Sequence, residues 1–299
     1  MELAAVILNH NDNDNAVRVA GVLQAVAGMG RVLVADNSGA GGLPGGALPP
    51  GCELLRIPNN GYAAGNNAAL RLLEADAPEY VVISNPDVFV EPAAVRACAD
   101  FLRANPGFAV AAPRMYTAAG EPYPNPAWHE RTFRSDIRYT SGLLSRLLGM
   151  GVEWYGEGDF AGESCVVDCV EGAFFVARFS AFREAGFFDE HTFLYYEEDI
   201  LCFRLKRLGY QNALLCRLPF LHCEGASVNR SYNLVRRFAA VQKSMLYFHR
   251  RYLKTPPPQY LLLCAGVALG FAWNAGRLAL RRARGLSTAA GSVPGQPGD

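Results

Sequence analysis

Runs of mostly apolar residues alternate with short polar segments along the first third of the chain. The runs cover residues 3–8, 31–35, 52–57 and 80–84, and each is followed within two residues by Asn or Asp. Short apolar runs bounded by such polar residues indicate strands buried in a parallel sheet. A fifth run, at residues 108–112, extends the series.

Helical segments are expected between these strands. They are residues 16–27, capped by Asp14 or Asn15, residues 68–74, and residues 92–104. Strands that alternate with helices are typical of a parallel sheet covered by helices. We therefore expect an α/β protein with a Rossmann-like, mixed but mainly parallel sheet. Ligands bind such sheets at the carboxyl ends of the strands, where the polar segments lie.

The middle of the chain follows a different pattern. Residues 114–165 lose periodicity and are rich in Tyr and Trp, which suits either a sugar-stacking surface or a satellite core under a long loop. Residues 166–178 predict a strand with a break at Gly172. A helix is expected next, because leucines at positions 201, 205 and 208 have helical spacing and Gly209 follows them.

Three acids in a row, at positions 197–199, open this expected helix. One acid there complements the helix dipole. Mutual repulsion and partial burial of three would raise the pKa of one carboxyl, which is how a general base is made.

Two further segments offer ligand groups. Residues 59–67 place two glycines and four asparagines before a helix, which suits either a phosphate or ribose site or a simple helix cap. Asp87 ends the fourth strand, and we interpret it as either a site residue or an ordinary turn residue. His222 joins Asp87 as a candidate metal ligand.

The C-terminal part combines basic and apolar stretches. Residues 229–285 predict cationic amphipathic helices, with a break at residues 254–258 and an uncharged stretch at residues 260–276. That stretch suits an interfacial anchor on an anionic membrane, a buried or oligomer-forming helix, or a marginal membrane span. Residues 286–299 are expected to be disordered.

Composition excludes some classes of function. The chain has 28 basic and 28 acidic residues, so no overall field indicates nucleic acid as a partner. Its 8 cysteines lack zinc-site spacing, and reduced thiols are expected. No signal-peptide pattern is visible, which favours a cytoplasmic protein. The first strand is followed by neither a dinucleotide-binding glycine motif nor a P-loop.

Taken in order, these segments resemble the inverting family 2 glycosyltransferases of the GT-A fold, particularly the bacterial rhamnosyltransferase-like members. The resemblance covers about residues 3–255. The segments that carry it are residues 9–11, 36–38, 59–67, 85–87, 171–174, 186–190, 195–201 and 222–227. It implies a catalytic domain at residues 1–228, with a nucleotide-binding half at 1–113 and an acceptor-binding, catalytic half at 114–228.

The resemblance also implies roles for single residues. Asp87 matches the last acid of the family's Asp-x-Asp metal motif, whose first position is Asn85 here, and His222 matches the histidine that completes the metal site. Mg²⁺ or Mn²⁺ would bridge the diphosphate. Aligning the family's acidic motif gives the role of base to Glu198, and a shift of one residue gives it to Asp199. The residues implied for nucleotide-sugar binding are Asn9, Asn11, Asp36, Asn59, Gly61, Gly65, Asn66, Asn85 and Gly172.

The implied reaction is transfer of a sugar from a nucleotide diphosphate, with dTDP-rhamnose as the best single donor, to a glycan or lipid-linked acceptor in polysaccharide synthesis. The expected location is the cytoplasm, including the inner face of the cell membrane, where the apolar and basic stretches of residues 230–285 would make peripheral contact. The sequence allows a homo-oligomer but does not determine the oligomeric state. The alternative hypothesis is a catalytically silent partner protein that binds nucleotide-sugar, because the acidic motif is shifted.

Overall fold

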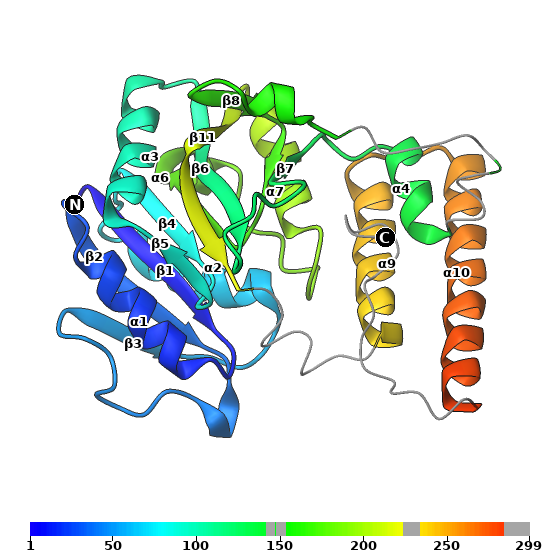
Figure 1. Ribbon diagram of the computed structural model, residues 1–299, viewed down its shortest axis with the longest axis horizontal. Coiled ribbons are helices and arrows are strands. Elements are labelled where there is room, and N and C mark those ends of the chain that lie inside the picture. The colour runs from blue at the N-terminus through cyan, green and yellow to red at the C-terminus, as the bar shows by residue number, and fades with distance from the viewer. Residues whose placement is uncertain (142–146, 148–153, 224–233, 284–299) are drawn as a thin grey trace. The chain divides into compact units, whose positions relative to one another are not determined.

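The computed structural model describes residues 1–141, 147, 154–223 and 234–283 of the chain (Figure 1). The chain divides into two compact units. The sheet unit comprises Met1–Glu130, Trp154–Glu190 and Glu197–Ser227. The helical unit comprises Arg131–Glu153, His191–Tyr196 and Val228–Asp299. Its first two segments come from the middle of the chain and interrupt the sequence of the sheet unit.

The sheet unit is built on a mixed sheet with the strand order β3-β2-β1-β4-β10-β6-β11-β5, and β8 pairs with β11. The strands are β1 (Leu3–Asn9), β2 (Met29–Asp36), β3 (Cys52–Arg56), β4 (Tyr80–Ser84), β5 (Val88–Val90), β6 (Phe108–Thr117), β8 (Ser164–Val167), β10 (Phe174–Arg178) and β11 (Gln211–His222). Strands β3, β2, β1 and β4 pair in parallel, whereas β10 is antiparallel to both of its neighbours. The expected mainly parallel α/β sheet is confirmed.

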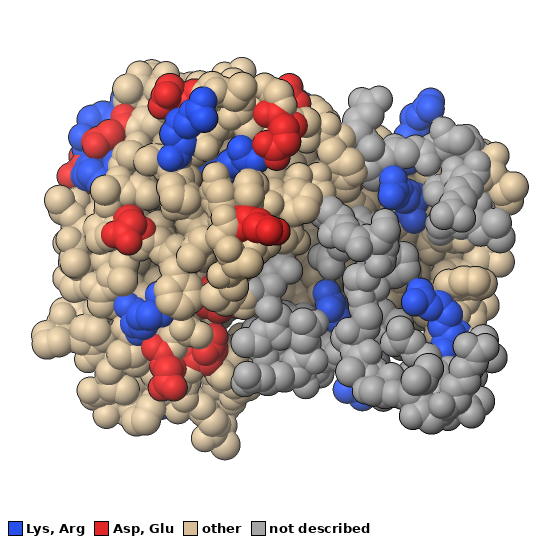
Figure 2. Space-filling view, viewed as in Figure 1, with Lys and Arg blue, Asp and Glu red and all other residues tan. Residues whose placement is uncertain are grey.

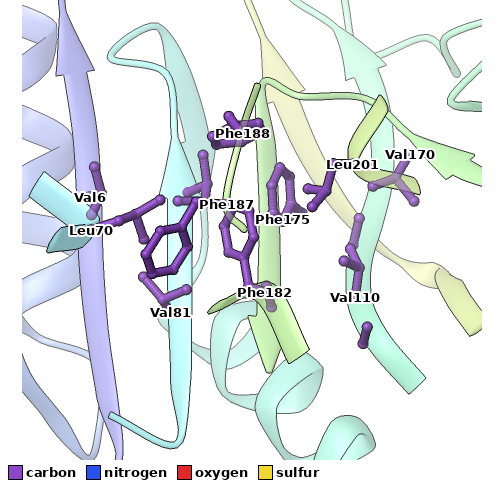
Figure 3. Close-up of a cluster of buried hydrophobic side chains, with 14 of the residues drawn as sticks. Val6, Leu70, Val81, Val110, Val170, Phe175, Phe182, Phe187, Phe188 and Leu201 are labelled. Atoms are coloured by element: carbon purple, nitrogen blue, oxygen red, sulfur yellow. The ribbon is translucent and has the colours of Figure 1, made fainter. Parts of the chain in front are cut away.

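Helices cover both faces of this sheet. They are α1 (Asn13–Gln24), α2 (Tyr62–Leu73), α3 (Pro92–Ala104), α6 (Phe179–Glu184) and α7 (Glu197–Arg207). Alternate residues of each central strand enter opposite cores, since Val6 packs with α2 and α7 while Ile7 packs with α1 and α3. Figure 3 shows the first core, where Phe175, Phe182 and Phe188 lie together.

Two helix starts differ from the sequence prediction. Helix α1 begins at Asn13 rather than residue 16, and no side chain caps it, so the expected caps at Asp14 and Asn15 are wrong. Helix α2 begins at Tyr62 rather than residue 68, because Gly61 with φ 99° provides the turn. Gly65 and Asn66 therefore lie inside a helix and not in a loop.

Gly65 brings α2 close to the sheet. A Cβ atom at this position would lie 2.5 Å from Cδ1 of Leu8, so a larger residue would push the helix away from β1. Asn66 is fully buried in the next position and donates a hydrogen bond to the carbonyl of Tyr62 (3.1 Å). Gly65 thus allows the close approach of α2 to β1, and Asn66 stabilises the first turn of the helix.

The helical unit contains α4 (Phe133–Thr140), α9 (Leu234–Arg251) and α10 (Pro257–Ala283). Its interior holds a fully buried ion pair, in which His249 Nε2 lies 3.0 Å from Asp136 Oδ2. The other ring nitrogen lies 2.7 Å from the hydroxyl of Thr255. Across the ranges that the structure describes, no helix combines the length and apolar character that crossing a membrane requires.

Substitution of Gly270 should destabilise the helical unit. A Cβ atom there would lie 2.2 Å from the carbonyl oxygen of Thr140 and 2.5 Å from the Phe238 ring. Gly270→Ala is expected to lower the free energy of unfolding by about 1–3 kcal/mol, the usual cost of overpacking. Gly276→Ala in the same helix is the matched control, because open space surrounds Gly276. It should raise stability by up to about 1 kcal/mol. Thermal melts of both variants that coincide would contradict this packing.

Candidate functional site

The polar corner at residues 85–87 joins β4 to β5 and is held from two sides. The backbone N–H of Asn85 donates to the carbonyl of Ala173 at 2.8 Å. From α1, Arg18 donates to the carbonyls of Pro86 (3.1 Å) and Val88 (2.9 Å). The guanidinium of Arg18 also lies 3.5 Å from the centre of the Phe89 ring. The corner is thus fixed by backbone hydrogen bonds before any ligand arrives.

Asp87 and His222 meet at this corner, as the sequence predicted. His222 Nε2 lies 3.3 Å from Asp87 Oδ1, and both side chains are largely buried. The pairing follows from the sheet, because β11 runs antiparallel to β5 and places His222 opposite Val88. The N–H of Cys223 also donates to the carbonyl of Asp87 (3.1 Å).

A carboxylate and an imidazole at this distance fit Mg²⁺ or, better, Mn²⁺ as two ligands. In the part of the chain that the structure describes, no group of three or more His, Cys, Asp or Glu side chains is placed to hold a metal ion. Two ligands fill only part of an octahedral shell, so diphosphate oxygens and water would complete it. The donor set therefore fits a metal that binds together with a nucleotide diphosphate.

Glu198 lies over the turn that precedes β10. A Cβ atom at Gly172 would lie 2.1 Å from Oε1 of Glu198, so the glycine makes room for this carboxyl group. The hydroxyl of Tyr62, at the start of α2, donates to the carbonyl of Gly172 (2.7 Å). Gly172 directly precedes Ala173, whose carbonyl binds the corner at Asn85. Glu198 and the Asp87 corner are therefore connected through one short turn.

Burial and neighbouring acids change the titration of this group. Desolvation raises the pKa of Glu198 well above its ordinary value, and the charges of Glu197, Glu171 and Asp199 raise it further. The same surroundings raise the pKa of Tyr62, again chiefly by burial. A carboxyl group that holds its proton more tightly than usual, and stands half-buried at the edge of a sheet, has the properties of a general base.

Asp199 is placed differently from Glu198. Its carboxylate is buried and accepts a hydrogen bond from the indole N–H of Trp128 at 2.7 Å. Glu197 is also buried. The two residues before the helix, Tyr195 and Tyr196, have φ values of 70° and 68°, a conformation that costs a non-glycine residue about 1–2 kcal/mol. Sequence reasoning missed Trp128 as a partner of Asp199, and only its place in an aromatic-rich segment could have signalled it.

A second polar cluster lies at the carboxyl ends of β1 and β2. Asp36 is buried and accepts hydrogen bonds from Asn9 Nδ2 (3.0 Å), the hydroxyl of Ser38 (2.6 Å) and the N–H of Leu43 (2.7 Å). Asn11 is exposed, with its N–H bound to Ser38. Asp36 thus orders the loop after β2, and both oxygens are engaged by the protein itself.

Asn59, which lies three residues after the end of β3, belongs to the same polar cluster. Its side-chain oxygen lies 3.4 Å from Asn37 Nδ2 and 3.4 Å from the N–H of Gly61. His10 Nδ1 lies 2.8 Å from the side-chain oxygen of Asn37, and neither residue was among the predicted site residues. The structure thus brings together Asn9, Asn11, Asp36 and Asn59, and it places Asn66 in the interior of α2. The segment at residues 224–227, part of the sequence resemblance, lies outside the described residues.

Comparisons with known proteins find similar glycosyltransferases. A hexosyltransferase of low-salt glycan biosynthesis from Haloferax volcanii is 24% identical over 208 residues, 69% of this chain and 62% of that protein. An N-acetylglucosaminyl-diphospho-decaprenol L-rhamnosyltransferase from Mycobacterium tuberculosis is 29% identical over 234 residues, 73% of each protein. The match therefore spans less than two thirds of the hexosyltransferase. No protein-family model matches the chain.

A mannosyltransferase from Pyrobaculum calidifontis, solved with GDP-mannose and Mn²⁺, has a similar structure. The TM-score is 0.52 at 14% identity, with 98% of this chain and 76% of that chain covered. At this identity the likeness establishes the fold, which is GT-A. The expected fold and the expected kinship with rhamnosyl- and hexosyltransferases are confirmed.

Glu198→Gln should make stability less dependent on pH. Because the pKa of Glu198 is raised in the folded state, its stabilising effect is complete at low pH and is lost as pH rises through the folded pKa. The glutamine variant avoids that loss, so its melting temperature should exceed that of the wild type at pH 8 and approach it at pH 4. Glu184→Gln, on an exposed helix end, serves as the control for a glutamate-to-glutamine change outside the site. Parallel curves for Glu198→Gln and the wild type would contradict a raised pKa.

Proposed function

We propose that this chain, a GT-A-fold protein distantly related to hexosyl- and rhamnosyltransferases, transfers a sugar from a nucleotide diphosphate to an acceptor hydroxyl with inversion at the anomeric carbon. The observation that carries the proposal is the short connection through Gly172. This turn contacts the carboxyl group of Glu198 through Gly172 and the corner that bears Asp87 and His222 through Ala173, which supports the proposal. A base and a diphosphate-binding pair at one edge of the sheet are what such a transfer requires.

The nucleotide would occupy the carboxyl ends of β1, β2 and β3. Asn9, Asn11 and Asn59 line this edge, and the exposed amides among them offer donors and acceptors to a base or ribose. Asp36 accepts hydrogen bonds from three groups of the protein, so we propose that it shapes the loop that receives the nucleotide. The position of Asn85, beside the metal ligands, suits contact with the diphosphate.

Asp87 and His222 would hold Mg²⁺ or Mn²⁺. The ion, when bound, neutralises negative charge on the departing diphosphate. The backbone around Asp87 supports this role, because Arg18 donates hydrogen bonds to the carbonyls of Pro86 and Val88 and the N–H of Cys223 donates to the carbonyl of Asp87 itself. These contacts restrain the backbone from which the Asp87 carboxylate projects, which favours a preorganised site.

Glu198 would take the proton from the acceptor hydroxyl as its oxygen attacks the anomeric carbon. The bond between that carbon and the diphosphate oxygen breaks on the opposite side, which inverts the centre. Because burial and the neighbouring acids favour the protonated form, ionised Glu198 is a stronger base than an ordinary carboxylate. Asp199, held by Trp128, would position the start of α7.

For the donor and acceptor we propose dTDP-rhamnose and a glycan or lipid-linked acceptor. The relative from Mycobacterium tuberculosis is named as a rhamnosyltransferase that acts on a decaprenol-linked sugar, which supports this choice. The test is a screen of UDP-, GDP- and dTDP-sugars by nucleotide release, with lipid-linked and free glycans as acceptors. Nucleotide binding without release or transfer across the panel would favour a silent sugar-nucleotide-binding partner instead.

Kinetics should separate Glu198 from Asp199, two of the three acids that open α7. Glu198→Gln is expected to lower kcat by about 10²–10⁴-fold, the usual contribution of a general base, and to keep donor affinity. Trp128→Phe removes the hydrogen bond to Asp199 and should lower kcat less than Glu198→Gln, without changing the pH at which activity rises. Full turnover by Glu198→Gln would remove it as the base.

Asp87→Asn should weaken metal-dependent binding of the nucleotide. Loss of one charged ligand from a site with two protein ligands is expected to lower the affinity for nucleotide diphosphate at least tenfold in the presence of Mn²⁺. Titration calorimetry with and without Mn²⁺ measures this. Asp159→Asn, an exposed acid of the same unit, is the control. Unchanged binding by Asp87→Asn would exclude Asp87 from the metal site.

A further inference from the structure

The charges of the chain are separated between its two units. The helical unit carries 15 Lys and Arg residues and 3 Asp and Glu residues, whereas the whole chain has 28 of each kind. The helical unit is therefore strongly basic and the sheet unit is equally acidic, and the two net charges cancel over the whole chain. In Figure 2 the part of the helical unit that the structure describes shows basic side chains and no acidic ones.

The acid that the structure describes in the helical unit is not available to balance this charge at the surface. Within residues 131–141, 191–196 and 234–283 the one acid is Asp136, which is fully buried against His249. Basic residues, in contrast, are exposed at Arg250, Arg251 and Lys254. The surface of this unit is therefore cationic in its described part, which attracts an anionic partner.

Helix α10 has an apolar face directed to solvent. Leu261, Leu269 and Trp273 are 68%, 52% and 67% exposed, and Ala265 and Ala272 share their side of the helix. An ordinary surface helix turns charged residues outward, and here residues 260–276 contain no charge at all. The opposite side of α10 packs against α9, through Phe271 on Phe238 for example.

Basic residues lie beyond both ends of this apolar face. Lys254 precedes α10, Arg277 is exposed one residue after the uncharged stretch, and Arg281 and Arg282 follow in the last turn of the helix. An apolar stretch with an exposed Trp and cationic ends matches an interfacial helix, whose apolar side enters the acyl boundary while its basic residues meet lipid phosphates. A nucleic-acid surface would instead need basic residues along the exposed face itself.

We propose that the helical unit docks on an anionic lipid bilayer through the exposed face of α10. The apolar face, defined by Leu261, Ala265, Leu269, Ala272 and Trp273, enters the interface. Lys254, Arg250, Arg251 and Arg277 contact the headgroups. This inference does not depend on the proposed sugar transfer, because it concerns the helical unit alone.

Vesicle co-sedimentation of the full chain tests the proposal. The wild type should sediment with vesicles of phosphatidylcholine that contain 30% phosphatidylglycerol, and much less with phosphatidylcholine alone. Binding should weaken as salt increases, because exposed charges are screened. Leu261→Ser with Leu269→Ser should reduce partitioning at least about tenfold, since two buried leucines are lost from the interface. Val166→Ser with Leu208→Ser removes exposed apolar residues from the sheet unit and should leave partitioning unchanged.

Charge variants and fluorescence test the same contact independently. Arg250→Gln with Lys254→Gln should weaken binding to the anionic vesicles roughly tenfold or more and should leave the weak binding to neutral vesicles unchanged. Arg103→Gln with Arg183→Gln, on the sheet unit, is the charge-matched control. Emission of Trp273 should shift to shorter wavelength when the anionic vesicles are added, and Trp273→Phe should abolish that shift.

Three results would overturn the proposal. One is equal sedimentation with neutral and anionic vesicles, or with neither. Another is a dimer in light scattering that Leu261→Ser with Leu269→Ser dissociates while vesicle binding is absent, which would assign the face to a second copy of the chain. The last is salt-sensitive binding of duplex DNA that exceeds binding to the anionic vesicles.

Discussion

One backbone hydrogen bond, from the N–H of Asn85 to the carbonyl of Ala173, holds the candidate site together. It joins two segments that are 88 residues apart in the chain. It forms because β10 inserts antiparallel between β4 and β6, which brings the turn before β10 to the end of β4. Without that insertion the corner at residues 85–87 and Glu198 at the start of α7 would have no common support.

The cores on the two sides of the sheet provide the rigidity that this arrangement needs. Phe174 packs toward one face and Phe175 toward the other, so β10 is fixed from both directions. Both side chains are almost fully buried. At about 25 cal/mol per Å² of apolar surface, burying two such rings contributes several kcal/mol to folding. A site built on this strand is held rigidly, because displacing the strand would disrupt both cores.

The apolar runs that end in polar residues predicted β1, β2, β3, β4 and β6, because they depend only on local pattern. The single strand expected at residues 166–178 is instead divided into the end of β8, a short strand β9 (Cys169–Val170) and β10, and β5 was not predicted. The sequence also predicted that Asp87 and His222 would meet, through the family resemblance. It did not predict that Asp36 would be engaged by the loop that follows it, or that Trp128 would bind Asp199. These contacts join residues 71 positions apart in the second case, and side-chain partners at such separation are set by the folded chain. The start of α2 was missed because Asn and Gly, which usually mark loops, are buried here inside a helix.

The sequence predicted the basic character of residues 229–285, whereas the assignment of residues 131–153 and 191–196 to the same helical unit depends on the folded chain. The aromatic-rich middle segment likewise divides between the units, since Trp128 belongs to the sheet unit and Tyr139 to the helical unit. The sequence analysis treats residues 114–165 as one region, whereas the structure divides them between the two units.

The contact between Gly172 and Glu198 has an evolutionary consequence. The glycine leaves space that the glutamate fills, with Oε1 where a methyl group would otherwise sit. A relative that carries the shorter aspartate at position 198 would have room for alanine at position 172, whereas glutamate excludes it. The two positions should therefore covary among homologous sequences, and their pairing would distinguish subfamilies that use acids of different length.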